Sequence, residues 1–216
     1  MLNNYKHIIW DWNGTLLNDV EFCCKIINRI LTEYNLPELT LKKYRQIFTF
    51  PVQDYYKEAG LDFTKTSFEV LGKDFIDEYE ENKLSCALFD NVVDVLSSIY
   101  KNGIGQSVLS AYLHDNLVSI LEHYSLAPFF DNIIGLDNIY AGSKTHLGLS
   151  LIEKLNLPKE NVLFIGDTLH DAEVAEAMGV KSVLIANGHQ VKERLIGDGR
   201  IIVDDMLSLK KYLGLN

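Results

Sequence analysis

Polar side chains that could do chemistry follow three apolar runs far apart in the sequence. Asp11 comes directly after residues 8–10, Ser110 after residues 108–109, and Asp167 after a third run. A short apolar run bounded by turn formers is typical of a buried strand. The carboxyl ends of parallel strands meet at one edge of a sheet, where ligands bind. The sequence therefore predicts that these three side chains gather at one sheet edge.

Two charged residues extend this predicted cluster. Asp171 stands four residues after Asp167, one helical turn on, so both carboxylates can face the same point. Lys144 stands at an expected helix start, where a basic side chain opposes the helix dipole, which indicates a negative neighbour. Grouped carboxylates tolerate one another around a hard cation, and Mg2+ prefers oxygen ligands and phosphate oxygens. A free carboxylate beside the phosphorus can attack it, so these residues favour Mg2+-dependent phosphoryl chemistry.

The segment around Asp11 also has a simpler interpretation. Asn13-Gly14 between apolar residues is a strong hairpin signal, and Asp11 could merely open that turn. This segment alone does not separate the two interpretations. The other acidic and basic positions, far away in the sequence, favour a functional site.

Composition limits the class of protein. The chain has 216 residues, 47% of them hydrophobic, and a formal net charge of −10. That length supports one core, or a core with a small satellite domain. Without a basic run, we expect neither a nucleic-acid nor a membrane partner. The cysteines lack metal-site spacing, and no secretory leader or spanning run is evident, so we expect free thiols in a cytoplasmic protein. The sequence leaves the oligomeric state open.

Strand and helix patterns alternate after about residue 85. This alternation predicts a parallel sheet with helices on both faces. The expected strands are residues 5–10, 104–109, 133–136, 162–165, 182–185 and 201–203, and the expected helices are 91–101, 114–124, 144–155, 171–178 and 206–213.

Between the first strand and residue 84 the patterns are all helical. The expected helices are residues 18–34, with Asn18 and Asp19 as caps, and 40–48, 51–59 and 64–82. This part is rich in aromatic residues, which we expect to form the core of a small bundle rather than a ligand site. These aromatic residues are Tyr44, Phe48, Phe50, Tyr55 and Tyr56.

Taken together, the motifs resemble the haloacid dehalogenase superfamily of aspartyl-nucleophile phosphotransferases and phosphatases. The matching pieces are Asp11-Trp12-Asn13-Gly14-Thr15, Ser107-Val108-Leu109-Ser110, Lys144 and Gly166-Asp167-Thr168-Leu169-His170-Asp171. They occur in the family's order across essentially the whole chain, and most resemble the phosphoglycolate-phosphatase-like branch. The resemblance implies a three-layer α/β/α Rossmann-like parallel sheet with a small helical cap inserted after the first strand. The core would be residues 1–17 and 85–216, and the cap residues 18–84.

The resemblance also implies roles for individual residues. Asp11 would be the nucleophile, phosphorylated by a small phosphorylated metabolite and then hydrolysed. Ser110, Ala111 and Lys144 would hold the phosphoryl oxygens. Asp11, Asp167, Asp171 and the main-chain carbonyl of Asn13 would hold Mg2+.

Position 13 departs from the family pattern. Phosphatases of this family usually carry an aspartate there as general acid and base, whereas this chain has Asn13. Losing such a proton transfer typically costs on the order of 10²–10⁴ in rate. Three explanations remain: the leaving group needs no proton, His170 or a cap residue supplies it, or the protein mainly binds a phosphorylated ligand. We favour a phosphatase, and Asn13 leaves slow turnover as an open alternative.

Two further alternatives concern the substrate. A non-acidic position 13 also occurs in phosphonate-cleaving relatives, but no cap lysine here has a matching context for a Schiff base. The presence of Asp167 and Asp171 speaks against metal-free dehalogenation.

Arg45 and Lys57 could contact a second anionic group of the substrate, although solvated helix charges are the more ordinary interpretation.

Overall fold

A computed structural model describes residues 2–138, 143–197 and 199–215. Its main sheet has six parallel strands in the order β5-β4-β1-β6-β7-β8. The strands are β1 (His7–Trp10), β4 (Gly105–Leu113), β5 (Asn132–Leu136), β6 (Val162–Gly166), β7 (Lys181–Ile185) and β8 (Ile201–Val203). The first strand of the chain is thus central, with β4 and β6 on either side of it.

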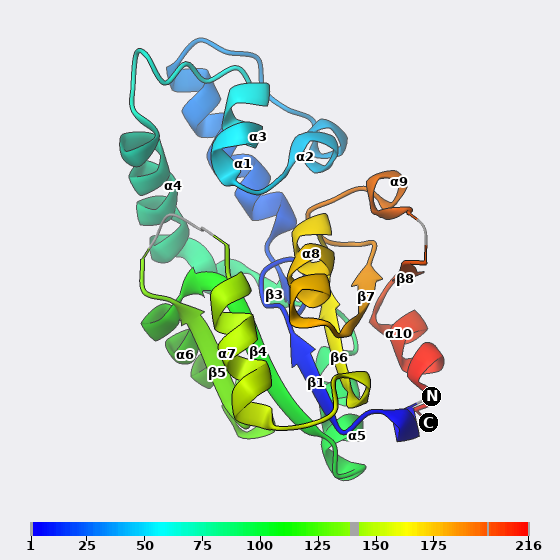
Figure 1. Ribbon diagram of the computed structural model, residues 1–216. Coiled ribbons are helices and arrows are strands. Elements are labelled where there is room, and N and C mark those ends of the chain that lie inside the picture. The colour runs from blue at the N-terminus through cyan, green and yellow to red at the C-terminus, as the bar shows by residue number, and fades with distance from the viewer. Residues whose placement is uncertain (1, 139–142, 198, 216) are drawn as a thin grey trace.

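Helices cover both faces of this sheet (Figure 1). Side chains of α5 (Val92–Lys101), α6 (His114–His123) and α10 (Met206–Leu213) share one buried cluster with Ile8 and Trp10 of β1. Ile9 points the other way and packs with α7 (Thr145–Leu155) and α8 (Leu169–Met178). The predicted three-layer α/β/α architecture is confirmed.

The sequence of β1 fits its central place. All four residues from His7 to Trp10 are buried, as expected for a parallel strand covered on both faces. The buried indole of Trp10 donates its hydrogen bond to Gln106 Oε1 of β4 at 3.1 Å. The chain then turns sharply, with Gly14 at φ +74°, a conformation that costs glycine little. Strand β1 therefore positions Asp11 at the carboxyl edge of the sheet.

Four helices lie together beyond the carboxyl ends of the central strands (Figure 1). They are α1 (Val20–Glu33), α2 (Leu41–Ile47), α3 (Val52–Glu58) and α4 (Phe68–Asn82). The chain enters and leaves this group through a short antiparallel ribbon that the sequence did not predict. This ribbon pairs β2 (Leu17–Asn18) with β3 (Ala87–Leu88). The main chain thus passes to and from the helices at two adjacent points.

Three predicted helix starts were wrong, each for a local reason. Helix α4 begins at residue 68 rather than 64, because the Asp62 carboxylate accepts hydrogen bonds from Thr64 N and Oγ1 and forms a separate turn. Helix α8 begins at residue 169 rather than 171, because Thr168 and Asp171 form a reciprocal capping box. Asn18 belongs to β2 rather than to a helix cap.

Strand β4 continues to Leu113 instead of ending before Ser110. Its pairing with β5 shifts: Leu109 faces Ile134, but Leu113 faces Leu136. Four steps along β4 therefore match two along β5, and the intervening residues bulge out of the ladder. Bulges of this kind re-aim side chains next to functional sites. Ser110 lies in this bulge.

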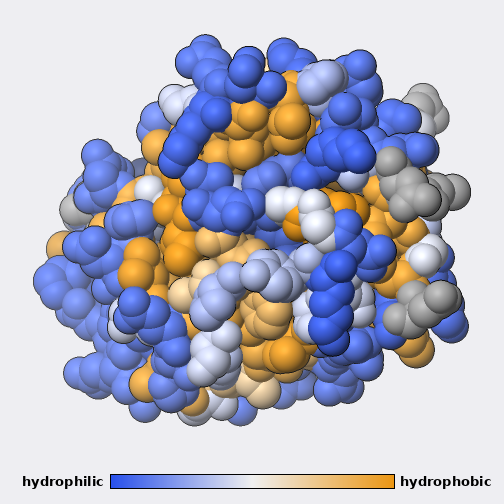
Figure 2. Space-filling model, turned by 90° about the horizontal axis from the view of Figure 1, so that it is seen from below, coloured by the Kyte–Doolittle hydropathy of each residue, from blue (hydrophilic) through white to orange (hydrophobic). Residues whose placement is uncertain are grey.

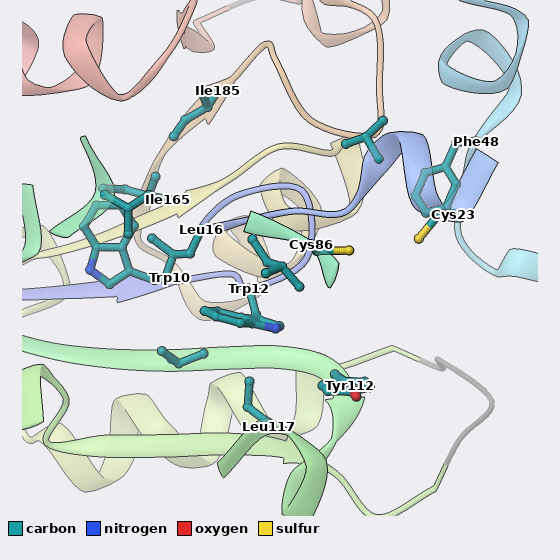
Figure 3. Packing of buried hydrophobic residues seen from close by; sticks show 14 of the residues in the cluster. Trp10, Trp12, Leu16, Cys23, Phe48, Cys86, Tyr112, Leu117, Ile165 and Ile185 are labelled. Atoms are coloured by element: carbon teal, nitrogen blue, oxygen red, sulfur yellow. The ribbon is translucent and has the colours of Figure 1, made fainter. Parts of the chain in front are cut away.

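The buried core runs from the sheet into the four-helix group. Figure 3 shows this cluster extending from Trp10 and Ile165 of the sheet to Cys23 and Phe48 of the helical part. The three cysteines are free and buried, as expected. Seen from the end opposite α1–α4, hydrophilic residues cover much of the surface, with hydrophobic ones gathered between them (Figure 2). No helix among the described residues is long and apolar enough to cross a membrane.

Candidate active site

A buried lysine joins two of the predicted carboxylates. Lys144 Nζ contacts Asp11 Oδ1 and lies 2.7 Å from Asp171 Oδ1. Asp11 follows β1, Lys144 stands at the N-cap position of α7, and Asp171 lies in the first turn of α8. All three side chains are more than nine-tenths buried. The fold thus brings together residues that are up to 160 positions apart (171 − 11 = 160).

Asp167 completes the acidic group from the end of β6. Thr15 Oγ1 donates a hydrogen bond to Asp167 Oδ1 at 2.8 Å and lies 3.4 Å from Asp11 Oδ2. The His189 amide donates to Asp167 Oδ2 at 2.6 Å. Oxygen atoms of Asp11, Asp167 and Asp171 all lie within 4.8 Å of one another. The convergence predicted from strand ends and helical spacing is therefore present.

The charges of this group are unequal. Burial, opposed by the Lys144 ammonium and reinforced by Asp171 and Asp167, raises the pKa of Asp11 to about 8. Burial also outweighs the help of His189 and raises the pKa of Asp167 to about 6. Asp171 is buried too, but Lys144 and the Thr168 hydroxyl hold its pKa below the ordinary value.

Three carboxylates and one ammonium leave a surplus of two negative charges (−3 + 1 = −2) when all are ionised. The donor atoms are all oxygens, which suits a hard divalent cation such as Mg2+. Burial is the largest cause of the raised pKa values of Asp11 and Asp167, and the neighbouring carboxylates raise both pKa values further. The residues present therefore fit a divalent cation.

Ser110 and Ala111 line the cavity that contains the acidic group. Ser110 is buried, and its Oγ accepts a hydrogen bond from the Tyr112 amide at 3.1 Å. Because the hydroxyl oxygen accepts there, its hydrogen stays available for an oxygen in the cavity. Both Ser110 and Ala111 lie in the β4 bulge, where the regular pairing with β5 is interrupted.

Asn13 is held by a network that the sequence analysis missed. Its Nδ2 donates to Asp19 Oδ2 at 2.7 Å and to the Tyr79 hydroxyl at 2.7 Å. Asp19 Oδ1 also accepts from Gly14 N at 3.0 Å and lies 3.2 Å from His189 Nε2. Asp19 occupies the N-cap position of α1, yet its side chain makes no capping bond. The Asp19 side chain, expected to cap the helix, instead accepts hydrogen bonds from Asn13 and Gly14.

Asp19 and His189 form a buried pair in which each side chain favours the charged form of the other. Burial opposes both charges, but their proximity lowers the pKa of Asp19 and raises the pKa of His189. The Cys23 sulfur lies within 4.8 Å of ligand atoms of both residues. Its thiol donates a hydrogen bond to Asp19 Oδ2 at 3.6 Å, and burial raises the pKa of this thiol. A metal at this second cluster would need the thiolate, so we interpret it as a hydrogen-bonded network. No motif marks His189 in the sequence.

A cavity of about 150 Å³ opens from the acidic group toward the four helices. Apolar and aromatic side chains make up its far wall. All five aromatic residues predicted to be helical core line it: Tyr44, Phe48, Phe50, Tyr55 and Tyr56. The same residues pack in the buried cluster or against it. The expected packing in the core is confirmed, and the same rings also border the cavity.

Three other candidates have different outcomes. Arg45 is committed to the carbonyl oxygens of Ala186 and Gln190, and does not line the cavity. Lys57 pairs with Asp54 on the surface and does not line it either. His170 does line the cavity, with its ring stacked on Phe50 and its buried Nε2 without a hydrogen-bond partner.

Comparison with known proteins identifies the family. Residues 8–185 match the model of the family described as haloacid dehalogenase-like hydrolase. The chain belongs to this family. The resemblance inferred from the motifs is confirmed, and membership of a hydrolase family supports the expectation of an enzyme.

Individual relatives are distant but cover most of the chain. A phosphoglycolate phosphatase of Salmonella paratyphi A (strain ATCC 9150 / SARB42) is 23% identical over 242 residues, covering 99% of this chain and 94% of that protein. The pyrophosphatase PpaX of Listeria monocytogenes serotype 4a (strain HCC23) is 26% identical over 186 residues, covering 82% and 81%. A crystal structure described as a predicted phosphatase from Clostridium acetobutylicum has a TM-score of 0.80 at 24% identity, covering 98% and 99%. The structural likeness supports the fold.

Proposed function

We propose that this haloacid dehalogenase-like hydrolase is a Mg2+-dependent phosphatase of small phosphorylated metabolites, acting through an aspartyl-phosphate on Asp11. We also propose that residues 1–17 and 85–216 form the catalytic core and residues 18–84 the cap. The observation that carries the proposal is that Lys144 lies between Asp11 and Asp171. Oxygen atoms of Asp167 and of these two aspartates lie within 4.8 Å of one another. The names of the phosphatase relatives point the same way.

Asp11, Asp167, Asp171 and the main-chain carbonyl of Asn13 would hold the cation. When bound, Mg2+ supplies positive charge that neutralises the cluster and the phosphate oxygens. Both oxygens of Asp171 already have partners, Lys144 on one side and the start of α8 on the other. We therefore assign Asp171 to hold the cation through water and to orient Lys144.

The phosphoryl group would meet three donors. We assign the Ser110 hydroxyl, the Ala111 amide and Lys144 to its oxygens, since each is a donor at the edge of the cavity. Lys144 lowers the pKa of Asp11 against the effect of burial and so favours its ionised form, which is the form that can attack phosphorus. Asp11 then carries the phosphoryl group until water releases it.

The four-helix group would exclude bulk water and select the organic part of the substrate. The aromatic wall of the cavity comes from this group and faces the acidic cluster. Schiff-base chemistry on a phosphonate has no support among the described residues, because Lys144, the cavity's lysine, is a charged partner of two carboxylates.

A panel of phosphomonoesters, assayed with and without Mg2+, tests this function. We expect release of phosphate that requires the cation and is abolished in Asp11→Asn. Saturable binding of phosphorylated compounds without turnover would instead support the alternative, a non-catalytic phospholigand-binding protein. A folded Asp11→Asn variant with full activity would refute the covalent route.

A further inference from the structure

The cavity beside Lys144 differs from what a doubly anionic substrate needs. Its cap-side wall consists mainly of rings and aliphatic side chains: Phe48, Phe50, Tyr55, Tyr56, Phe68, Phe75 and Ile76. Among the described lining residues, Lys144 is the sole lysine or arginine. The positions outside the described ranges contain no lysine, arginine or histidine. A second anionic group on the substrate would therefore lie in this cavity without a cation to pair with.

Two cations of residues 18–84, Arg29 and Lys83, are committed to carboxylates. Arg29 contacts three carboxylates, those of Glu33, Asp74 and Glu78. Lys83 lies 2.6 Å from Glu80 and donates to the Tyr112 hydroxyl at 3.1 Å. Neither lines the cavity.

The two histidines of the lining do not supply a free positive charge. His189 has Asp19 as its counter-ion at 3.2 Å. The ring of His170 stacks on Phe50, and its Nδ1 lies 3.5 Å from the Glu173 carboxylate. Two tyrosine hydroxyls of the lining also have partners, Tyr44 with His189 and Tyr79 with Asp19. The wall thus offers ring surface rather than charge.

A second observation concerns the leaving oxygen. Both N–H hydrogens of the Asn13 amide have partners in Asp19 and Tyr79, so its free atom is a carbonyl oxygen, which only accepts. Residue 13 therefore cannot protonate a departing oxygen. An alkoxide, whose conjugate acid is about as weak as water, is a poor leaving group unless it receives that proton. A phenolate, with a pKa of about 10 for its phenol, leaves without one far more easily.

We propose that the substrate is an aryl phosphomonoester: a neutral aromatic group joined to phosphorus through a phenol-type oxygen. This inference deepens the proposed phosphatase function and rests on it. The ring lies against the aromatic wall, and the phosphoryl group faces Asp11 and Lys144. A cavity of about 150 Å³ is large enough for one benzene ring.

The reaction balances without a proton donor at position 13. An Asp11 oxygen forms a bond to phosphorus while the bond between phosphorus and the aryl oxygen breaks. The electron pair leaves on that oxygen, and the phenolate takes its proton from water. Water then attacks the phosphorus of the aspartyl-phosphate, which returns Asp11 as carboxylate and releases inorganic phosphate.

The test compares three esters in the presence of Mg2+. Phenyl phosphate and 4-(carboxymethyl)phenyl phosphate share an aryl leaving oxygen and differ in charge, so we expect kcat/KM to favour phenyl phosphate by at least about tenfold. The third, 2-phenylethyl phosphate, keeps the ring but leaves as an alkoxide, and we expect a drop of at least about a hundredfold. Preference for the carboxylated ester, or equal rates for the aryl and alkyl esters, would overturn the inference.

A pair of variants on α4 locates the effect. Ile76→Lys places a cation in the cavity lining and should reverse the preference between the two aryl esters. Val70→Lys makes the same charge change at an exposed position of the same helix, 58% exposed, and should keep the wild-type ratio. An unchanged ratio in Ile76→Lys would show that the organic group lies outside this cavity, which contradicts the inference.

Binding of two phosphonates, which carry no hydrolysable ester, separates this inference from the proposed function. We expect phenylphosphonate to bind more tightly than 2-carboxyethylphosphonate in calorimetry with Mg2+. Tighter phenylphosphonate binding without turnover of any ester would refute the phosphatase and retain the ligand class. Turnover with preference for carboxylated ligands would retain the phosphatase and refute the aryl substrate.

Discussion

The side-chain nitrogen of Asn13 lies 2.7 Å from Asp19 Oδ2, inside a buried network that also includes Tyr79 and His189. A carboxylate only accepts hydrogen bonds, so this contact fixes which end of the amide faces Asp19. The amide oxygen is then left for the cavity. Position 13, where phosphatases of this family usually carry the general acid, therefore presents only a hydrogen-bond acceptor, the amide oxygen of Asn13.

Asn13→Asp restores a titratable group at this position. The new carboxyl would meet Asp19 at hydrogen-bond distance, and two carboxylates that close share a proton, which raises the pKa of one of them. A protonated carboxyl is a general acid, so we expect kcat/KM for an alkyl phosphomonoester to rise by about 10²-fold, and that for phenyl phosphate to change little. Steady-state kinetics on both esters checks this. A fall for both, with folding intact by circular dichroism, would show that Asn13 has its own function.

Breaking the Asp19–His189 pair should destabilise the fold strongly. Both groups are fully buried, and removing one partner leaves an uncompensated polar or charged group. We expect Asp19→Asn to lower the free energy of unfolding by about 3–5 kcal/mol in urea denaturation. Asp94→Asn is the control, because Asp94 pairs with Lys210 at the surface and should cost about 0–1 kcal/mol. Equal costs would mean that the buried pair contributes no more than an exposed one.

The same pair predicts a pH window. The pKa of His189 is raised, so its contribution is complete below about pH 6.5, the ordinary value, and is lost as pH rises through its higher folded-state pKa. The pKa of Asp19 is lowered, so its contribution is complete above about pH 3.9 and is lost as pH falls through its lower folded-state pKa. We expect the stability difference between wild type and His189→Gln to be largest between these two values. A difference that grows toward pH 9 would contradict the pair's charge state.

Cation binding should depend on pH with the opposite sign. The raised pKa of Asp11, about 8, means that the cation-free fold binds protons more tightly than the unfolded chain and loses stability as pH rises toward 8. Mg2+ binds the ionised carboxylates, so its stabilising effect should grow over the same range, to about 2.7 kcal/mol at a hundred times its Kd. Thermal unfolding at several pH values measures this. The Mg2+ effect should vanish in Asp167→Asn and persist in Asp204→Asn, a surface partner of Lys192.

His170 offers a direct check on the proton source. Its Nε2 is buried without a partner and the residue lines the cavity, so His170 is an alternative acid. If an aryl leaving oxygen needs no proton, His170→Ala should keep kcat/KM for phenyl phosphate within about twofold, because the general-acid factor of about 10²–10⁴ is not in use. A drop of that larger size would make His170 the acid.

The sequence predicted the sheet and the acidic cluster because both follow from strong local signals. Short apolar runs marked each strand of the main sheet, and a parallel sheet forces their carboxyl ends to one edge. Asp11, Asp167 and Asp171 therefore converged as expected. The β4 bulge and the short ribbon of β2 and β3 were missed, since pairing between distant segments sets them rather than local composition.

The network around Asn13 could not be predicted in the same way. His189 lies in a loop with no motif, and only the three-dimensional fold brings it to Asp19. The sequence predicted that Asp19 is an ordinary helix cap. In the structure its side chain instead accepts hydrogen bonds from Asn13 and Gly14. The aromatic residues posed a different problem. A ring pattern shows that side chains are buried, but not whether the buried surface also borders a cavity.

The most direct test of the account is to trap the phosphorylated enzyme. Wild-type protein, quenched with acid during turnover of phenyl phosphate with Mg2+, should carry one phosphoryl group on the peptide that contains Asp11 by mass spectrometry. Asp11→Asn should carry none and show no turnover. Turnover at the wild-type rate in Asp11→Asn, or a phosphoryl group found on another residue, would contradict the account.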